Sequence, residues 1–278
     1  MDSSYKQEVK RYGKKDAIIA VCAVLFFVAI VEIYEAILYI TPIELEALPY
    51  IVRRLEWPIM KSVFSIVPIV IILSVTKQGL VSIGIHKENL WRGVRLGIML
   101  SLIPILWGIL PMALYGGIFG GFGLFTVLLI RTFMMAAAED VLFVGFLQTR
   151  LSGFFKSGKL ALCLGAALFS LMHVPPWLRT GQLSFDNLPH FGIMIMIWFT
   201  MHFVLVAVYR RYKSLIPVTI LHVAVNFISS SWWVFADDYV GYAQSWNATT
   251  WPSLIIAVSV WMFILRRRDK KARLSSES

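Results

Sequence analysis

The chain has little charge and almost no cysteine. Of its 278 residues, 15% are charged and 58% are hydrophobic, and the mean hydropathy is +0.74. So little charge excludes an ordinary soluble domain and indicates a polytopic membrane protein. Only Cys22 and Cys163 are present, each within an apolar run, which argues against a disulfide framework and a cysteine-ligated zinc site.

Features of nucleotide or nucleic-acid binding are also missing. The net charge is +10, but the basic residues lie at the termini and at the ends of apolar runs, not along a face interleaved with aromatic residues. The glycine-rich stretch 116–123 has no strand before it and no Lys-Ser/Thr after it, so we interpret it as a turn, not a phosphate loop. We therefore expect the lipid bilayer, and no nucleic acid, as a partner.

Apolar runs of about 20 residues, the length that crosses a bilayer, recur along the chain. They predict an all-α transmembrane bundle in which 1–278 form a single integral membrane domain and 266–278 a basic cytoplasmic tail. Loops on the side of the N-terminus are rich in Lys and Arg, Arg150 included, and the opposite loops are poorer, so both termini are predicted to be cytoplasmic. The expected location is the cell membrane if the organism is prokaryotic and the endoplasmic reticulum if it is eukaryotic. About eight spans are predicted, at 17–39, 58–76, 94–115, 124–150, 160–174, 190–209, 214–231 and 251–265.

Two adjacent carboxylates, Glu139 and Asp140, interrupt the fourth predicted span. Placing an acid near the centre of a membrane helix costs about 2.5 to 3.5 kcal/mol, so acids at this depth indicate functional sites. Three candidate partners, His173, His222 and Asn226, lie in later predicted spans. At about 1.5 Å per residue, Glu139 and the two histidines reach the middle or the cytoplasmic half of the membrane.

The spacing within each helix groups the candidate partners. His222 and Asn226 are four residues apart and share one helix face, and the same holds for Phe169 and His173. A single buried histidine is more often a packing group than a catalyst. A glutamate, two histidines and an asparagine at compatible depths instead favour a functional site. His202, in the sixth predicted span, is kept as a reserve candidate.

These residues form three motifs, Glu139-Asp-Val-Leu-Phe-Val144, Phe169-Ser-Leu-Met-His173 and His222-Val-Ala-Val-Asn226. In this order they resemble the Glu-Glu-x-x-x-Arg, Phe-x-x-x-His and His-x-x-x-Asn/Asp motifs of the CAAX-protease and bacteriocin-processing family of intramembrane proteases, which includes the type II CAAX prenyl endopeptidases. The resemblance covers about residues 80–231, which we expect to form the catalytic core. Asp140 stands where the family has its second glutamate, and Val144 stands where it has arginine.

The resemblance implies an intramembrane endopeptidase that hydrolyses a peptide bond of a membrane-associated or prenylated, CAAX-type, protein or peptide. It implies that Glu139 is the general base and that His173 helps to hold the attacking water. His222 and Asn226 would stabilise the oxyanion, a role for which imidazole and amide donors are suited. The predicted catalytic residues are Glu139, His173, His222 and Asn226, with Asp140 and Phe169 in support and with Phe143, Phe146, Phe169 and Trp198 lining a substrate cavity.

Other interpretations stay open. Glu139, His173 and His222 are a three-residue set of the kind that binds catalytic zinc, but the chain lacks a sequence-local His-Glu-x-x-His motif, which favours a mechanism without a metal or other cofactor. A catalytically inactive family member could act as a membrane scaffold or a bacteriocin-immunity factor. Buried acids and histidines also occur in proton-coupled transporters, although the chain shows no internal repeat of the kind that many transporters contain.

Overall fold

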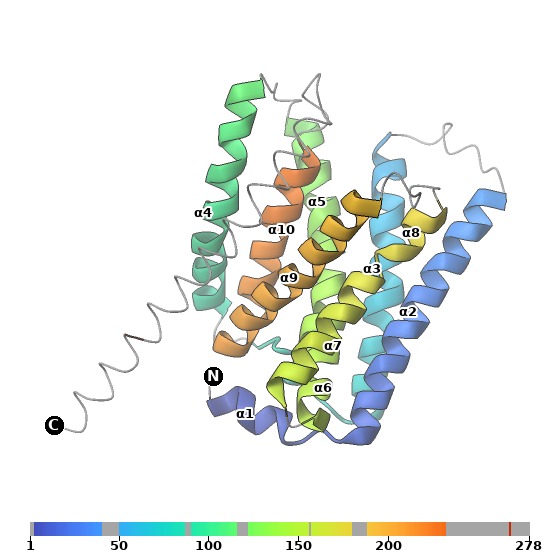
Figure 1. Ribbon diagram of the computed structural model, residues 1–278, viewed down its shortest axis with the longest axis vertical. Coiled ribbons are helices and arrows are strands. Elements are labelled where there is room, and N and C mark those ends of the chain that lie inside the picture. The colour runs from blue at the N-terminus through green and yellow to red at the C-terminus, as the bar shows by residue number, and fades with distance from the viewer. Residues whose placement is uncertain are drawn as a thin grey trace.

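The computed structural model describes residues 3–40, 50–86, 90–115, 122–155, 157–179, 188–231 and 267. Every regular element in these ranges is a helix, which confirms the all-α prediction for the part of the chain described. Figure 1 shows the long helices running alongside one another, with the short helices α1 and α6 near one end and α8 towards the other. The helices are α1 (Ser3–Val9), α2 (Lys14–Ile40), α3 (Tyr50–Val75), the 3₁₀-helix η2 (Leu80–Ile83), α4 (Leu90–Tyr115), α5 (Phe122–Glu139), the π-helix η3 (Asp140–Leu147), α6 (Gln148–Phe155), α7 (Gly158–Leu171), α8 (Val174–Arg179), α9 (Leu188–Tyr212) and α10 (Leu215–Ser231).

Four helical segments within the described residues are long and apolar enough to cross a membrane, and a fifth apolar helix, Leu215–Phe227, is shorter. They coincide with the first, second, fifth, sixth and seventh predicted spans. The third and fourth predicted spans are also helical, whereas 251–265 lies outside the described residues. A multi-pass helical membrane protein is thus confirmed, while the number of spans and the side of the termini stay predictions. The four long segments are Lys14–Leu38, Leu55–Val75, Gly158–Arg179 and Leu188–Tyr212.

Large apolar side chains lie on the outside of the bundle. Phe26, Ile37, Ile71 and Met196 are each more than half exposed. Lipid tails are as apolar as these side chains, so this surface suits a bilayer. For the same reason close packing and buried polar contacts, and not the hydrophobic effect, must hold the helices together.

The fourth predicted span is one continuous helical rod in which a π-helix, η3, separates α5 from α6. η3 contacts α2, α3, α7, α9 and α10, so it lies at the centre of the bundle. Gly145 permits close approach to η2, because a Cβ at this position would lie only 2.8 Å from the carbonyl oxygen of Ile83. A π-helix bonds each N–H to the carbonyl five residues back, and such segments are frequent at functional sites. The acid pair lies at the junction where α5 ends and η3 begins.

Side chains of η3 are buried in two apolar clusters. Phe143 and Phe146 pack in the cluster that includes apolar residues of α2 and α3. Val144 is fully buried in the other cluster, with Leu205 of α9 and Leu221 of α10. Position 144, where the family motif has arginine, is therefore buried among apolar side chains of α9 and α10.

The charge pattern suggested that Arg150 lies in a cytoplasmic loop, and this prediction is wrong. Arg150 belongs to α6 and is only 1% exposed. Its guanidinium donates to the side chain of Gln78 and to Ser82 Oγ at 3.2 Å, and it lies 4.4 Å from the ring centroid of Tyr12. Arg150 thus connects α6 to η2 and to the turn before α2, which is a structural role at the end of the bundle near α1.

Candidate active site

The predicted site residues come from separate helices that meet beside η3. Glu139 ends α5 and Asp140 begins η3, while His222 and Asn226 lie one turn apart on α10. Phe169 lies in the last turns of α7 and His173 two residues beyond the end of that helix. α10 packs against both α5 and η3, and α7 also contacts η3. Glu139, Asp140 and His222 are almost completely buried, and Asn226 is half-buried.

His222 joins the first and third motifs. Its Nδ1 lies 3.0 Å from Asp140 Oδ1, and its Nε2 lies 3.7 Å from Glu139 Oε2. Because an ionised carboxylate only accepts hydrogen bonds, Nδ1 carries the proton and donates it to Asp140. Asp140 therefore fixes the orientation of the imidazole ring, and the other ring nitrogen faces Glu139.

Lys61 of α3 contributes a cation to the same cluster. Its Nζ donates to Glu139 Oε1 at 2.5 Å, in an ion pair whose side chains are 11% and 5% exposed. Two serines on the same helix dock α3 onto α5 beside this pair. Ser62 donates to the carbonyl of Met134 at 3.1 Å, and Ser65 donates to the carbonyl of Ala138 at 2.7 Å.

Phe169 and His173 form the third side of the site. His173 Nδ1 lies 2.9 Å from the carbonyl oxygen of Phe169, so Nδ1 donates and a neutral ring leaves Nε2 as an acceptor. The His173 ring stacks on Trp198 of α9, with centroids 4.2 Å apart and an angle of 14°. The Phe169 ring lies 6.4 Å from the His222 ring and 5.2 Å from the His173 ring. Phe169 therefore packs against both histidines.

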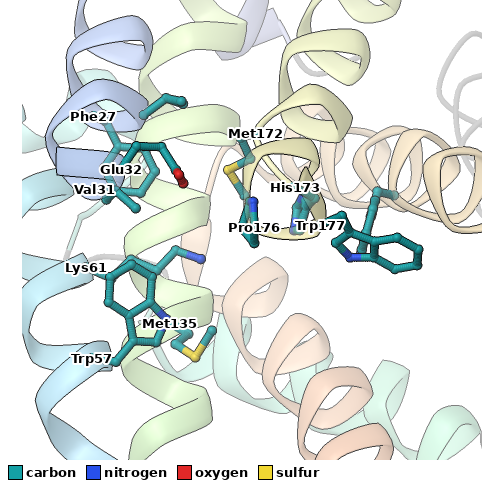
Figure 2. Close-up of a pocket in the computed structure, with 12 residues that line it drawn as sticks. Phe27, Val31, Glu32, Trp57, Lys61, Met135, Met172, His173, Pro176 and Trp177 are labelled. Carbon is teal, nitrogen blue, oxygen red and sulfur yellow. The ribbon is translucent and has the colours of Figure 1, made fainter. Parts of the chain in front are cut away.

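A cavity of about 210 Å³ opens beside these residues. Lys61 reaches into it from α3 and His173 faces it from the end of α7, as Figure 2 shows. Trp57, Trp177 and Trp198 are among its walls. Of the four predicted lining residues only Trp198 borders this cavity. The other three, Phe143, Phe146 and Phe169, are buried within the bundle.

The cavity also has an acidic wall residue, Glu32 of α2, which is already paired. Arg179 of α8 donates to Glu32 Oε2 at 2.6 Å and lies 3.4 Å from Glu35 Oε2. This pair ties α8 to α2 next to the cavity. Glu32 is therefore engaged with its own cation, in an ion pair distinct from that of Glu139 and Lys61.

The reserve candidate His202 lies in a different polar contact. It is completely buried, and its Nε2 lies 3.0 Å from Gln148 Oε1. Gly165 of α7 makes room for this pair, because a Cβ there would lie within 3 Å of both side chains. His202 is thus a packing histidine that joins α9 to α6.

The alternative zinc set does not converge in this arrangement. Among the residues that the structure describes, no three His, Cys, Asp or Glu side chains are placed to hold one metal ion. Glu139 is bonded to Lys61, which occupies one of its carboxylate oxygens, whereas the Nδ1 contacts of His173 and His222 leave the Nε2 atom of each ring open. The arrangement therefore pairs Glu139 with the ammonium of Lys61.

Sequence reasoning missed Lys61. The signal was present, because an ionisable residue within an apolar membrane span is a functional candidate by default, and Lys61 lies inside the second predicted span. Its partner could not be identified from the sequence, since 78 residues separate Lys61 from Glu139.

Comparison with known proteins agrees with the motifs. Residues 121–228 match the family model described as Type II CAAX prenyl endopeptidase Rce1-like. No curated protein and no solved structure is detectably similar to the chain. The matched segment starts beside the first residue of α5 and ends within α10, so it contains every predicted catalytic residue, whereas Lys61 lies outside it. Over residues 121–228, less than half of its length, the chain is similar to the Rce1-like type II CAAX prenyl endopeptidases.

Proposed function

We propose that this protein is an intramembrane endopeptidase that uses Glu139 to activate water against a peptide bond of a membrane-associated or prenylated, CAAX-type, protein. The observation that carries the proposal is the approach of His222 Nε2 to within 3.7 Å of Glu139 Oε2, because it joins the first and third motifs in one buried cluster. The cavity that Lys61 and His173 line lies next to this cluster and provides space for a substrate.

In the proposed first step, Glu139 takes a proton from a water molecule while the water oxygen attacks the carbonyl carbon of the scissile bond. The carbonyl π electrons move to oxygen, and the resulting oxyanion is stabilised by the amide of Asn226 and by His222, which for this step carries a proton on Nε2 as well as on Nδ1. A single donor in such a role typically lowers the activation free energy by about 2.7 to 4 kcal/mol. In the second step the C–N bond breaks, and the proton held by Glu139 passes to the leaving amine. The products are a carboxylic acid and an amine.

His173 is suited to hold the attacking water. Its Nδ1 donates to the carbonyl of Phe169, so Nε2 of the neutral ring is an acceptor for a water proton. The stacking contact with Trp198 limits rotation of the ring, and His173 lines the cavity. The water would thus be held between a fixed acceptor and the proposed base.

The two acids then have different roles. Asp140 is bonded to His222, and we infer that it positions this histidine without reacting. Glu139 has one oxygen on Lys61, and its other oxygen approaches His222 at a distance longer than a hydrogen bond. This second oxygen, Oε2, therefore keeps a lone pair with which to accept the proton from water.

The charge around Glu139 supports a mechanism without zinc. The ammonium of Lys61 already lies 2.5 Å from Oε1, and a divalent cation bound to the same carboxylate would be repelled by it. No step in the proposed reaction requires a metal. Chelation of the purified protein tests the preference for a mechanism without a metal.

The direct test is cleavage by the purified full-length protein in lipid vesicles. The probe is a prenylated CAAX-type peptide with a fluorophore and a quencher on opposite sides of the expected cleavage site. In parallel, membrane peptides that accumulate when the protein is deleted from its own cells are identified by mass spectrometry. We expect the wild type to cleave and Glu139→Gln to lose cleavage, because glutamine cannot take the proton.

Glu35→Gln is a matched control, since Glu35 is another carboxylate in a membrane helix but lies outside the cavity lining. It should keep cleavage. Equal cleavage by wild type and Glu139→Gln would refute the glutamate mechanism. If neither the probe nor any cellular peptide depends on the protein, the peptidase proposal is wrong, and the scaffold or immunity role replaces it.

A further inference from the structure

The acid pair needs more positive charge than the family segment of this chain supplies. Glu139 and Asp140 are adjacent and almost completely buried, and removing two carboxylates from water is costly unless each has a partner. Asp140 is paired with His222. The family arginine is replaced by Val144, whose side chain lies among apolar side chains of α9 and α10.

We propose that Lys61 is a positioning residue for the catalytic glutamate, which keeps Glu139 ionised and holds its second oxygen towards the water site. The proposal rests on the function proposed above, in which Glu139 is the base. It adds a residue of α3, outside both the family motifs and the matched segment 121–228, to the catalytic apparatus.

The contact between Lys61 and Glu139 has the geometry that this role requires. The distance of 2.5 Å between Nζ and Oε1 is at the short end for a charge-assisted hydrogen bond. Both side chains are nearly buried, so water screens the pair only weakly. Lys61 bonds one carboxylate oxygen and leaves the other for proton transfer, as the mechanism demands.

α3 is fixed relative to the acid pair by two contacts with the part of α5 that precedes Glu139. Ser62 bonds the carbonyl of Met134, and Ser65 bonds the carbonyl of Ala138, the residue directly before Glu139. These bonds hold the register of α3 against α5. The ammonium is therefore held against Glu139 by the packing of two helices, and its position does not depend on a flexible loop.

Arg150 does not supply the missing charge, although it is a buried cation in the same helical rod. Its guanidinium donates to Gln78, which lies between α3 and η2, and to Ser82 of η2. It lies ten residues beyond Asp140 in the sequence, at the end of the bundle near α1. Lys61 is the cation that the structure places on Glu139.

The first experiment measures the ion pair without requiring cleavage. Infrared difference spectra between Glu139→Gln and its parent isolate the carboxyl band of Glu139. With Lys61 present, we expect the band of an ionised carboxylate. In Lys61→Met we expect that band to be replaced by that of a neutral carboxylic acid, because an unpaired buried carboxylate is too costly. An ionised band in both backgrounds would overturn the proposal.

Thermal unfolding in the same vesicles gives an independent readout. If Lys61 and Glu139 are paired, the shifts in unfolding temperature of Lys61→Met and Glu139→Gln will not add in the double variant, which will be less destabilised than their sum. Additive shifts would contradict the pairing. Lys61→Gln is the second neutral variant, to be used for both measurements if Lys61→Met does not fold.

The second experiment measures kcat and KM with the quenched peptide. Neutral variants at Lys61 should lower kcat by roughly a hundredfold, as expected when one partner of a buried ion pair is removed, with little change in KM. Lys61→Arg keeps the charge and should recover most of the lost kcat. A rise in KM with unchanged kcat, or no recovery by arginine, would refute the positioning role.

Ser65→Ala is the matched control for packing. It removes a hydrogen bond between the same two helices, next to Glu139, and leaves the ion pair intact. If it lowers kcat as much as Lys61→Met, the effect of Lys61 is only helix packing and the proposal fails. If the wild type cleaves nothing, the proposed function fails, and the spectra and unfolding shifts still decide whether Lys61 controls the charge of Glu139.

Discussion

Substitution of Asp140 tests whether the two acids of the site have different roles. Asp140 is completely buried and accepts the hydrogen bond of His222 Nδ1 at 3.0 Å. In Asp140→Ala the imidazole loses this acceptor and is no longer held with Nε2 facing Glu139. The base itself remains, so the variant should be impaired and not inactive.

The size of the effect follows from the bond that is lost. A hydrogen bond to a charged group contributes about 1.5 to 3 kcal/mol, and about 1.4 kcal/mol corresponds to a tenfold change in rate. Asp140→Ala should therefore lower kcat about 10- to 100-fold. Asp140→Asn keeps an acceptor oxygen without the charge and should cost less. We expect Glu139→Ala, His173→Ala and His222→Ala each to be more damaging than Asp140→Ala.

The assay is the initial rate of peptide cleavage in vesicles over a range of substrate concentrations. Ser101→Ala is a control on the other side of α10, because Ser101 of α4 donates to the carbonyl of Ile220 at 3.2 Å. This control should leave kcat nearly unchanged. If Asp140→Ala abolishes cleavage while Glu139→Ala retains it, Asp140 is the base and the assignment within the acid pair is wrong.

Four further predictions concern the metal, the π-helix and the topology. After strong chelation the purified protein should keep most of its peptidase activity; loss restored by zinc, with one zinc bound per chain, would reverse the preference for a metal-free mechanism. The motif spacing alone predicts that Val144→Arg is tolerated, because the arginine would lie near Asp140; the complete burial of Val144 among apolar side chains predicts destabilisation instead, and unfolding at the wild-type temperature would contradict this. Gly145→Ala should cost about 1 to 3 kcal/mol, since its Cβ would lie 2.8 Å from the carbonyl oxygen of Ile83, whereas Gly13→Ala, with no atom within 4 Å, should be nearly neutral in the same unfolding assay. Reporter fusions at residue 278 should be cytoplasmic, and an external reporter would disprove the arrangement of eight spans.

The helices and the motif residues were predictable because their signals are local. Apolar runs and four-residue spacings gave most of the described helices and placed His222 beside Asn226 on one face of α10. The conservative difference between Asp140 and glutamate also gave a testable division of the acid pair. These inferences need only the chain within one helix; the structure confirms the helices, and the division of roles within the acid pair stays a prediction.

Two features could not be obtained in this way. Val144 packs in an apolar cluster with residues of α9 and α10, and the sequence of its own helix does not show which helices cover this position. Arg150 was indistinguishable from the basic residues of a cytoplasmic loop, since the sequence does not show that Gln78 and Ser82 receive its guanidinium. In both cases the deciding contact comes from a distant part of the chain.

The same reasoning explains why the site extends beyond the matched family segment. Residues 121–228 carry both acids and both proposed catalytic histidines, but position 144 within them cannot supply a cation. The cation that pairs with Glu139 comes from α3. Two serine hydrogen bonds hold this helix against α5. Since α3 also contributes Trp57 to the cavity, one helix both lines the substrate space and carries the counter-charge of the proposed base. A substitution that shifts α3 is therefore expected to change substrate binding and the charge of Glu139 together, whereas one that replaces Lys61 alone changes mainly the charge.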